Sequence, residues 1–554
     1  MNLPNPALVS QQAVKQLPRL ALLLLCAAYV LPGVFGRDPW KNADLSAVGY
    51  MLSLARGHAD WLAPSLGGLP AEGGLLPYWI GSASILLFDG WIEPVLAARL
   101  PFALLLTAAL ALTWYASFHL ARTDKAQPLA FAFGGEAQPV DYARTIADAS
   151  VLALIGSLGL LQLGHETTPE LVQLAATTLV LYGLAASPFR RWRSRVAVLT
   201  ALPVLAISAA PTTAVLFGAV ATLVCLRSTY ENARRFAPWV AAATLLAALA
   251  ASALHAWTWR ISGEAPTLAL PRLLAWFTWP VWPLAAWTLW QWRRQLGHRH
   301  LSVPLCLAGV AAGCSMAMGG NDRALMLALP SLAVLAAFAL PTLKRSVSAA
   351  IDWFSVFFFT AAGLTLWVMY IAVHTGHPGK PAANVAKLLP GFEPRFSLPA
   401  LLLALAGTLA WAWLVRWRTG HHRQALWKSL ILPAGGVAWG WLLTMTLWLP
   451  MLDYARSYRP TMQQLARVLP ADACVVTVNL SRPQLAALTV HSRWRTTSDR
   501  DDRRCAWMLV HQPGPQGQPR GTDHRPSPEG PWQFVQRIHR PTDRQEGLLI
   551  YRRR

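Results

Sequence analysis

The sequence predicts an all-α polytopic membrane protein with a small α/β domain at its C-terminal end. Hydrophobic residues make up 54% of the 554 residues, whereas Asp, Glu, Lys and Arg together make up only 13%, about half of the usual share in a soluble domain. Leu- and Ala-rich runs of about 20 residues, the length of a helix that crosses a bilayer, recur along the chain. These observations exclude a soluble multidomain enzyme, a disordered chain, a disulfide-stapled secreted module and a membrane β-barrel.

About thirteen of these apolar runs are expected to cross the membrane. The first lies between Leu17 and Phe35, and it is expected to be an uncleaved helix because more spans follow it, whereas a signal peptide precedes a soluble domain. The other spans are expected at residues 97–121, 145–163, 170–187, 196–209, 211–227, 237–256, 271–291, 302–318, 323–342, 352–373, 397–415 and 429–449.

Residues 36–96, between the first and the second span, carry too many charged residues to cross the membrane throughout. Two short stretches of this outer loop, 45–56 and 77–88, are apolar on one side, which is typical of helices that lie along the membrane surface. Together with the spans, the loop forms a predicted membrane module over residues 1–449.

The distribution of positive charge predicts the topology. The net charge is +22, and the basic clusters, such as Arg190–Arg193 and Arg416–Arg418, lie in loops that fall on one side when thirteen spans are counted. The positive-inside rule then places the N-terminus in the cytoplasm and residues 450–554 on the outer side of the membrane. Because the basic residues alternate with apolar runs and form no nucleic-acid-binding module, the lipid bilayer is an expected partner and nucleic acid is not.

The C-terminal segment 450–554 differs in composition from the rest and is expected to form the small α/β domain. It contains two strand-like runs, Cys474–Val478 and Ala506–Val510, and a Pro/Gly/Gln-rich stretch at 512–531. Cys474 and Cys505 stand at the beginning of the two runs. A disulfide between them and two free thiols are both compatible with the sequence.

Ionisable residues are nearly absent from the expected spans and gather at the outer helix ends instead. A secondary transporter usually keeps a charge near the bilayer midplane, so this pattern favours a reaction at the outer surface with one lipid-soluble reactant. Asp44, which follows the first span, is the strongest candidate, because a carboxylate there can accept a proton from an attacking hydroxyl or amine. The alternative is that Asp44 only caps the N-terminus of the next helix.

Several short motifs accompany Asp44 in a fixed order. They are Ala59-Asp60-Trp61, Pro64, Glu72, Pro77-Tyr78-Trp79 and Ala97-Ala98-Arg99-Leu100-Pro101. Over residues 38–101 the chain thereby resembles the first outer loop of the GT-C glycosyltransferases that use polyprenyl-phosphate sugars, above all the group of the aminoarabinose lipid A transferase and the protein mannosyltransferases. It differs from this group at Leu45, where the group has Glu, and at Gly73, where it has a Lys that is thought to hold the donor phosphate.

The resemblance implies roles for several residues. Asp44 is expected to be the general base, and Glu166, in the outer loop before the fourth span, to be a second catalytic carboxylate, with a plain polar loop as the alternative. Arg323 is expected to bind the lipid phosphate with paired hydrogen bonds, unless it only snorkels to the interface. The other candidate substrate-binding residues are Glu72, His165 and, in the Gly/Pro-rich loop 374–396, Lys380, Lys387 and Arg395.

A metal site is a further option at His165 and Glu166. Adjacent residues do not share a helix face, and no third ligand stands at a diagnostic spacing. The sequence therefore predicts no definite cofactor and leaves a divalent metal open.

The expected function is that of an inner-membrane glycosyltransferase. It moves a sugar from a polyprenyl-phosphate donor to a lipid, glycan or protein acceptor at the periplasmic face, with inversion at the anomeric carbon and Asp44 as the base. Two alternatives remain: a catalytically degenerate scaffold or lipid-carrier protein, indicated by Leu45 and Gly73, and a transporter or flippase.

Overall fold

A computed structural model describes residues 6–257, 269–420, 425–512 and 531–554. These residues are mostly helical, with one five-stranded sheet and a two-stranded hairpin. The chain divides into two compact units, each made of three segments. Unit 1 comprises residues 1–34, 102–365 and 399–446, and unit 2 comprises residues 35–101, 366–398 and 447–554. The predicted division into 1–449 and 450–554 therefore differs from this grouping, in which the outer loop clusters with the C-terminal segment.

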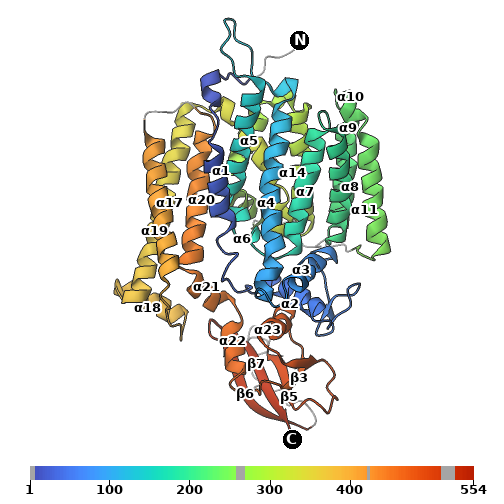
Figure 1. Cartoon of the computed structure of the whole chain (residues 1–554), viewed down its shortest axis with the longest axis vertical. Helices are drawn as coiled ribbons and strands as arrows, with labels where there is room; N and C mark the ends of the chain where they lie inside the picture. Colours follow the sequence, from blue (N-terminus) through green and yellow to red (C-terminus); the bar gives the residue numbers. More distant parts are fainter. Residues whose placement is uncertain (1–5, 258–268, 421–424, 513–530) are drawn as a thin grey trace. The chain divides into compact units, whose positions relative to one another are not determined.

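Unit 1 is a bundle of helices that run side by side (Figure 1). Its helices are α1 (Arg19–Val30), α5 (Pro139–Gly156), α6 (Leu158–Leu163), α7 (Pro169–Ala186), α8 (Arg191–Ile207), α9 (Pro211–Leu226), α10 (Glu231–Arg234), α11 (Ala237–Ala253), α12 (Ala269–Phe277), α13 (Val281–Gln291), α14 (Arg299–Ala317), α15 (Asp322–Met326), α16 (Leu329–Ala337) and α20 (Lys428–Thr446), with most of α4 (Pro94–Ala121), α17 (Arg345–Thr375) and α19 (Leu398–Thr419). Helix α8 packs against α7 and α11, and α5 packs against α16 and α20. Short 3-10 helices are found at Gln11–Val14, Asp124–Ala126, Arg293–Gln295 and Leu340–Thr342.

Eight helical segments within the described residues are long and apolar enough to cross a membrane. They are Pro94–Ala121, Pro169–Ala186, Glu231–Ala253, Arg299–Ala317, Asp322–Thr342, Arg345–Thr375, Leu398–Thr419 and Lys428–Thr446. A multi-span membrane protein is therefore confirmed, but the count of thirteen is not. Helices occupy all thirteen expected segments, yet several are short or interrupted, for example at Ser157 and at residues 278–280. The apolar content of a run, from which the spans were counted, does not show such breaks.

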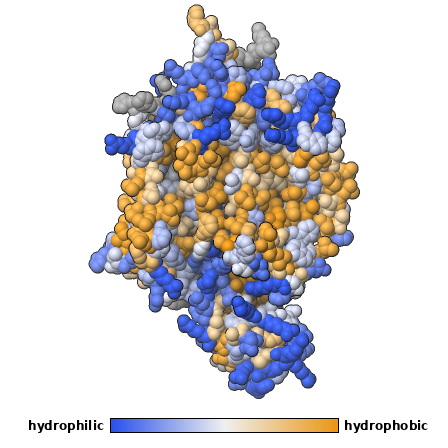
Figure 2. Space-filling model, viewed as in Figure 1, coloured by the Kyte–Doolittle hydropathy of each residue, from blue (hydrophilic) through white to orange (hydrophobic). Residues whose placement is uncertain are grey.

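The surface of unit 1 matches a bilayer environment. Hydrophobic side chains form a band across the face of the bundle seen in Figure 2, and hydrophilic side chains cover the end at which α1 begins (Figure 1). In α17 and α19, only 11% of the most apolar 18-residue stretch of each helix is buried inside the protein. Exposed Phe357 and Leu409 belong to these two helices, and such an extensive apolar surface needs a lipid neighbour.

Unit 2 contains the two predicted helices of the outer loop. They are α2 (Ala43–Ala55) and α3 (Leu76–Leu87), which confirm the helices expected at 45–56 and 77–88. Between them lies the hairpin of β1 (Ser65–Leu66) and β2 (Leu69–Pro70). The other helices of the unit are α18 (Gly379–Leu388), α21 (Leu449–Arg456), α22 (Arg459–Leu465) and α23 (Arg482–His491). Helix α2 packs directly on α23, because Gly49 leaves room where a Cβ atom would stand only 2.6 Å from Ala486 Cβ.

The sheet of unit 2 has the strand order β4-β3-β5-β7-β6. Its strands are β3 (Cys474–Val478), β4 (Arg495–Thr497), β5 (Trp507–Gln512), β6 (Trp532–Arg540) and β7 (Asp543–Arg553). Strand β3 is parallel to β4 and β5, whereas β7 is antiparallel to β5 and β6. The small mixed C-terminal sheet is thus confirmed, and Cys474 and Cys505 form a disulfide with a Cα–Cα distance of 4.5 Å. Most of the Pro/Gly/Gln-rich stretch at 512–531 lies outside the described residues.

Candidate functional site

Asp44 lies in the first turn of α2 as a buried ion-pair partner. Helix α2 begins at Ala43 and its N-cap is Asn42, so the alternative that Asp44 is the capping residue is wrong. The Oδ2 atom of Asp44 accepts the backbone N–H of Trp40 at 3.2 Å and lies 3.3 Å from Nη2 of Arg37. The side chains of Asp44 and Arg37 are 1% and 0% exposed. A pair this well buried is held in place, because removing either partner would leave the other charge in a water-poor site.

The Asp44–Arg37 pair belongs to a larger group of charges that sequence reasoning missed. Nη1 of Arg99, in α4, donates to the carbonyl oxygen of Arg37 at 2.9 Å. The Arg37 and Arg456 guanidinium groups lie 4.9 Å and 5.0 Å from the centroid of the Trp40 ring. Three guanidinium groups therefore gather around Trp40 and Asp44. The charged residues at the end of the first span were the signal in the sequence, but their partners are far away along the chain.

A second carboxylate cluster lies close by in unit 2. The Asp38 carboxylate binds the Arg459 guanidinium through two hydrogen bonds and accepts Ser457 Oγ at 2.9 Å. Burial raises the pKa of Asp38, but the hydrogen bonds and the charge of Arg459 outweigh burial and hold this pKa below its usual range. Asp453 accepts Trp40 Nε1 at 2.8 Å, and burial raises its pKa to about 7. Burial lowers the pKa of His491 to about 4.

These shifts predict opposite pH effects on stability. Folded Asp453 keeps, between about pH 4 and 7, a proton that the unfolded chain has released, so it makes the free energy of unfolding fall as pH rises. His491 acts the other way between about pH 4 and 6.5, because the unfolded chain there binds a proton that the folded chain does not. We expect the thermal unfolding temperature of Asp453→Asn to rise with pH across this window and that of His491→Gln to fall. The measurement is the unfolding temperature of each variant in detergent as a function of pH. The same pH dependence in both variants would contradict the pKa shifts assigned to Asp453 and His491.

Glu166 and Arg323, predicted as a second catalytic carboxylate and as the phosphate partner, lie together in unit 1. Arg323 is in α15, whose N-cap Asn321 accepts the backbone N–H groups of Arg323 and Ala324 at 2.9 and 3.1 Å. Nη2 of Arg323 donates to Glu166 Oε2 at 2.5 Å. Its Nη1 donates to Thr168 Oγ1 at 3.3 Å and lies 3.6 Å from Glu170 Oε2. One cation is thus shared between two carboxylates.

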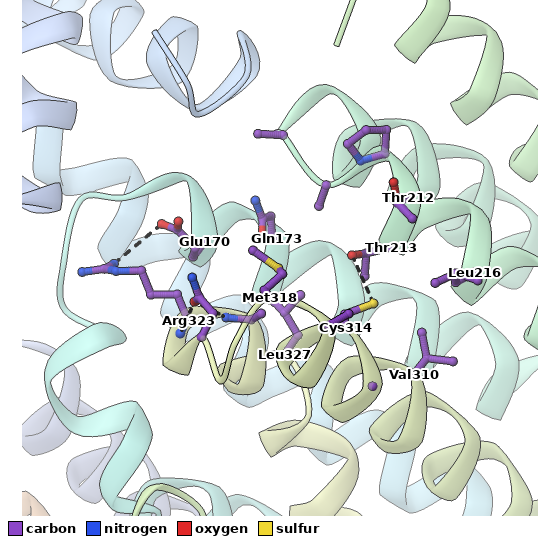
Figure 3. A pocket seen from close by; sticks show the side chains of 17 residues that line it. Glu170, Gln173, Thr212, Thr213, Leu216, Val310, Cys314, Met318, Arg323 and Leu327 are labelled. Carbon is purple, nitrogen blue, oxygen red and sulfur yellow. Dashed lines mark hydrogen bonds and ion pairs between the residues drawn. The ribbon is translucent and has the colours of Figure 1, made fainter. Parts of the chain in front are cut away.

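A cavity of about 350 Å³ opens beside Arg323 between α7, α9, α14 and α15. Arg323 and Glu170 lie at one end of it, and Thr213, Cys314 and Leu216 at the other (Figure 3). Its walls are mainly apolar, whereas the end at Arg323 is charged. A cavity of this kind suits a ligand with a polar head and an apolar body.

His165, predicted to bind substrate, is instead enclosed between helices of unit 1. Its Nδ1 and Nε2 atoms lie 2.6 Å and 2.8 Å from the carbonyl oxygens of Leu161 and Tyr29, and its ring lies 4.6 Å from that of Trp441. A carbonyl oxygen lies at hydrogen-bond distance from each ring nitrogen, so in this position neither nitrogen is open to a metal ion. In the part of the chain that the structure describes, no three His, Cys, Asp or Glu residues form a group that could hold a metal ion.

The remaining predicted residues lie in unit 2. Glu72 is exposed and forms an ion pair with Arg482 at 2.8 Å. Lys380 and Lys387 are exposed on α18, and exposed Arg395 follows it. The expectation of a loop throughout 374–396 is therefore wrong, because residues 379–388 form a helix after Pro378, its N-cap residue.

Comparison with known proteins identifies the fold. No family model matches the sequence, and no curated protein matches it either. The crystal structure of ArnT from Cupriavidus metallidurans bound to undecaprenyl phosphate is similar over 96% of this chain and 98% of that chain, with a TM-score of 0.63 and 14% identity. ArnT in the apo state gives a TM-score of 0.64, with 15% identity over 96% of this chain and 97% of that chain. The fold is that of ArnT.

The ArnT-like fold confirms the resemblance to the GT-C membrane glycosyltransferases that the first outer loop indicates. It extends that resemblance from residues 38–101 to nearly the whole chain, including the C-terminal sheet. At 14% identity the similarity concerns the fold alone, so the roles of Asp44, Glu166 and Arg323 depend on the chemistry of this chain.

Proposed function

We propose that this protein is a membrane glycosyltransferase that takes its sugar from a polyprenyl-phosphate carrier. The observation that carries the proposal is the ArnT-like fold over 96% of the chain, since ArnT was crystallised with undecaprenyl phosphate. The apolar band of unit 1 gives such a carrier access from the bilayer. The proposed location is a bacterial inner membrane with a cytoplasmic N-terminus and the C-terminal sheet in the periplasm, as the positive-inside rule indicates.

In the proposed reaction Asp44 is the general base. It takes the proton of the acceptor hydroxyl, whose oxygen attacks the anomeric carbon and inverts it, while the bond to the carrier phosphate breaks. The acceptor is a lipid, a glycan or a protein. The departing phosphate needs a cation, and buried or interfacial guanidinium groups are effective there because water is scarce.

Two sets of guanidinium groups can take the place of the Lys that is missing at Gly73. Arg323 lines the cavity of unit 1, whose charged end and apolar walls suit a phosphate on a prenyl chain. Arg37 and Arg456 lie beside Trp40 in unit 2, and Arg456 is exposed. We assign the carrier phosphate to Arg323, because its cavity also accommodates an apolar chain.

The second candidate function is a catalytically degenerate scaffold or lipid carrier. It is favoured by one specific observation: Asp44 is 1% exposed and paired with Arg37, so in this conformation a substrate has no direct access to it. On this reading the Asp44–Arg37 pair only organises the start of α2.

The test is an assay of carrier release with the purified protein in lipid vesicles. A polyprenyl-phosphate sugar labelled in the sugar is added together with membrane lipids and glycans as acceptors. Transfer of the label with release of polyprenyl phosphate supports the enzyme. Binding of the labelled lipid without cleavage supports the scaffold, and movement of the intact labelled lipid across the membrane supports a flippase.

A further inference from the structure

A second cavity, of about 220 Å³, lies in unit 1 between α1, α4 and α5. Its charged end consists of Arg19, Arg144 and Asp148, and apolar residues including Leu23 and Leu110 form its walls. It shares no lining residue with the cavity at Arg323, and the proposed glycosyl transfer makes no use of it.

The carboxylate at this charged end is fixed in position. Asp148 is 6% exposed, and its Oδ1 atom accepts Trp114 Nε1 at 2.8 Å. It also accepts a hydrogen bond from the backbone of Leu17. With two donors in place, Asp148 needs no salt bridge to stay buried.

The two guanidinium groups are available to a ligand. Both act on Asp148 through their charge, and the Arg19 guanidinium lies 5.9 Å from the centroid of the Trp114 ring. Throughout the described residues, neither Arg19 nor Arg144 forms a hydrogen bond or an ion pair with another residue. Each guanidinium group carries five N–H donors, and among the described residues none of them has a fixed acceptor. Two cations and one anion leave a net charge of about +1 there.

The walls of the cavity continue onto the lipid-facing surface. Leu20, Leu23 and Leu24 of α1 are 69%, 65% and 60% exposed, and Tyr115 of α4 is 51% exposed. Arg19 is the first residue of α1, so the charged end lies at the end of the bundle where α1 begins (Figure 1), which Figure 2 shows covered with hydrophilic side chains. A headgroup at Arg19 would therefore sit at the polar boundary, with its chains along apolar helix surface.

We propose that this cavity is a binding site for an anionic glycerophospholipid of the surrounding bilayer. Arg19 and Arg144 donate hydrogen bonds to the phosphate oxygens, and the acyl chains lie along α1 and α4. A phosphodiester such as that of phosphatidylglycerol carries a single negative charge, which matches the net charge of the site. A phosphate monoester carries up to two charges, and the second would be repelled by Asp148. Basic pockets between helices are a recurrent way of holding such headgroups.

The test is native mass spectrometry of the delipidated full-length protein with defined lipids. We expect phosphatidylglycerol to bind more tightly than zwitterionic phosphatidylcholine, and Arg19→Gln and Arg144→Gln each to weaken phosphatidylglycerol binding roughly fivefold. Arg195→Gln is the matched control, because Arg195 also stacks on a Trp ring, that of Trp239 at 4.6 Å, but does not line this cavity. It should leave binding unchanged.

Asp148→Asn tests the choice of headgroup. It raises the net charge of the site, so we expect it to increase the affinity for a polyprenyl monophosphate relative to phosphatidylglycerol. Equal binding of phosphatidylcholine and phosphatidylglycerol, wild-type binding by both arginine variants, or a polyprenyl monophosphate that displaces phosphatidylglycerol from the wild-type protein would overturn the proposal. Unfolding temperatures close to wild type show that each variant is folded. Loss of glycosyl transfer would not bear on this result, since the lipid site does not depend on it.

Discussion

Replacing Asp44 by Asn is expected to lower the rate of sugar transfer by roughly 10²- to 10⁴-fold, the usual contribution of a general base. Asn keeps the size of the side chain and can still accept the backbone N–H of Trp40, but it cannot take up a proton. The measurement is the release of polyprenyl phosphate from a labelled lipid-linked sugar, expressed per folded molecule. Retention of the wild-type rate would remove Asp44 from the mechanism.

Loss of activity alone does not separate catalysis from folding, because Asp44→Asn also leaves Arg37 without its buried partner charge. The control is Asp38→Asn. Asp38 lies six residues before Asp44 in the sequence, is 7% exposed and pairs with Arg459, but it has no assigned part in the chemistry. Both variants should lower the unfolding temperature, and only Asp44→Asn should lower the rate of the molecules that remain folded. An equal loss of rate in both variants would favour a structural role for the whole cluster.

Some elements of this structure can be predicted from short stretches of the sequence alone. The helices at Ala43–Ala55 and Leu76–Leu87 and the strand at Cys474–Val478 follow from apolar periodicity within a few residues, and the sequence predicts each of them closely. The number of spans does not follow in this way, because the run of residues 145–163 is apolar throughout most of its length and yet is interrupted at Ser157, where the backbone is extended.

The candidate site depends on contacts that are distant along the chain. Arg323 was predicted from its place at a helix end, and the structure brings it to Glu166, 157 residues away. Arg37 was missed as the ion-pair partner of Asp44, and Arg99 as the donor to the carbonyl oxygen of Arg37. An arginine near the end of a span looks the same in the sequence whether it reaches the interface or is buried against an acceptor. Sequence reasoning therefore finds the residue types of such a site, and tertiary packing decides the pairs.

The pair Arg323 and Glu170 gives a prediction in which two variants change binding in opposite directions. If Arg323 holds the carrier phosphate, Arg323→Gln should weaken the binding of polyprenyl phosphate roughly 10- to 100-fold, the effect of losing charge-assisted hydrogen bonds. Glu170 lies 3.6 Å from Arg323 Nη1 and lines the same cavity, so its charge competes with a phosphate for the guanidinium. Glu170→Gln removes this competitor and should strengthen binding. The measurement is equilibrium binding of polyprenyl phosphate to the purified protein.

If the ion pair of Arg323 and Glu170 only held α15 against α7, the result would be different. Either substitution would then loosen α15 from α7 and weaken binding through partial unfolding. Arg418→Gln serves as the matched control, since Arg418 also forms a buried ion pair, with Asp352 at 2.6 Å, and does not line the cavity. It should lower the unfolding temperature to an extent similar to Arg323→Gln without changing the affinity for polyprenyl phosphate. Weaker binding in Glu170→Gln, or a similar loss of affinity in Arg418→Gln, would show that the charge of Arg323 acts on the fold and not on the carrier.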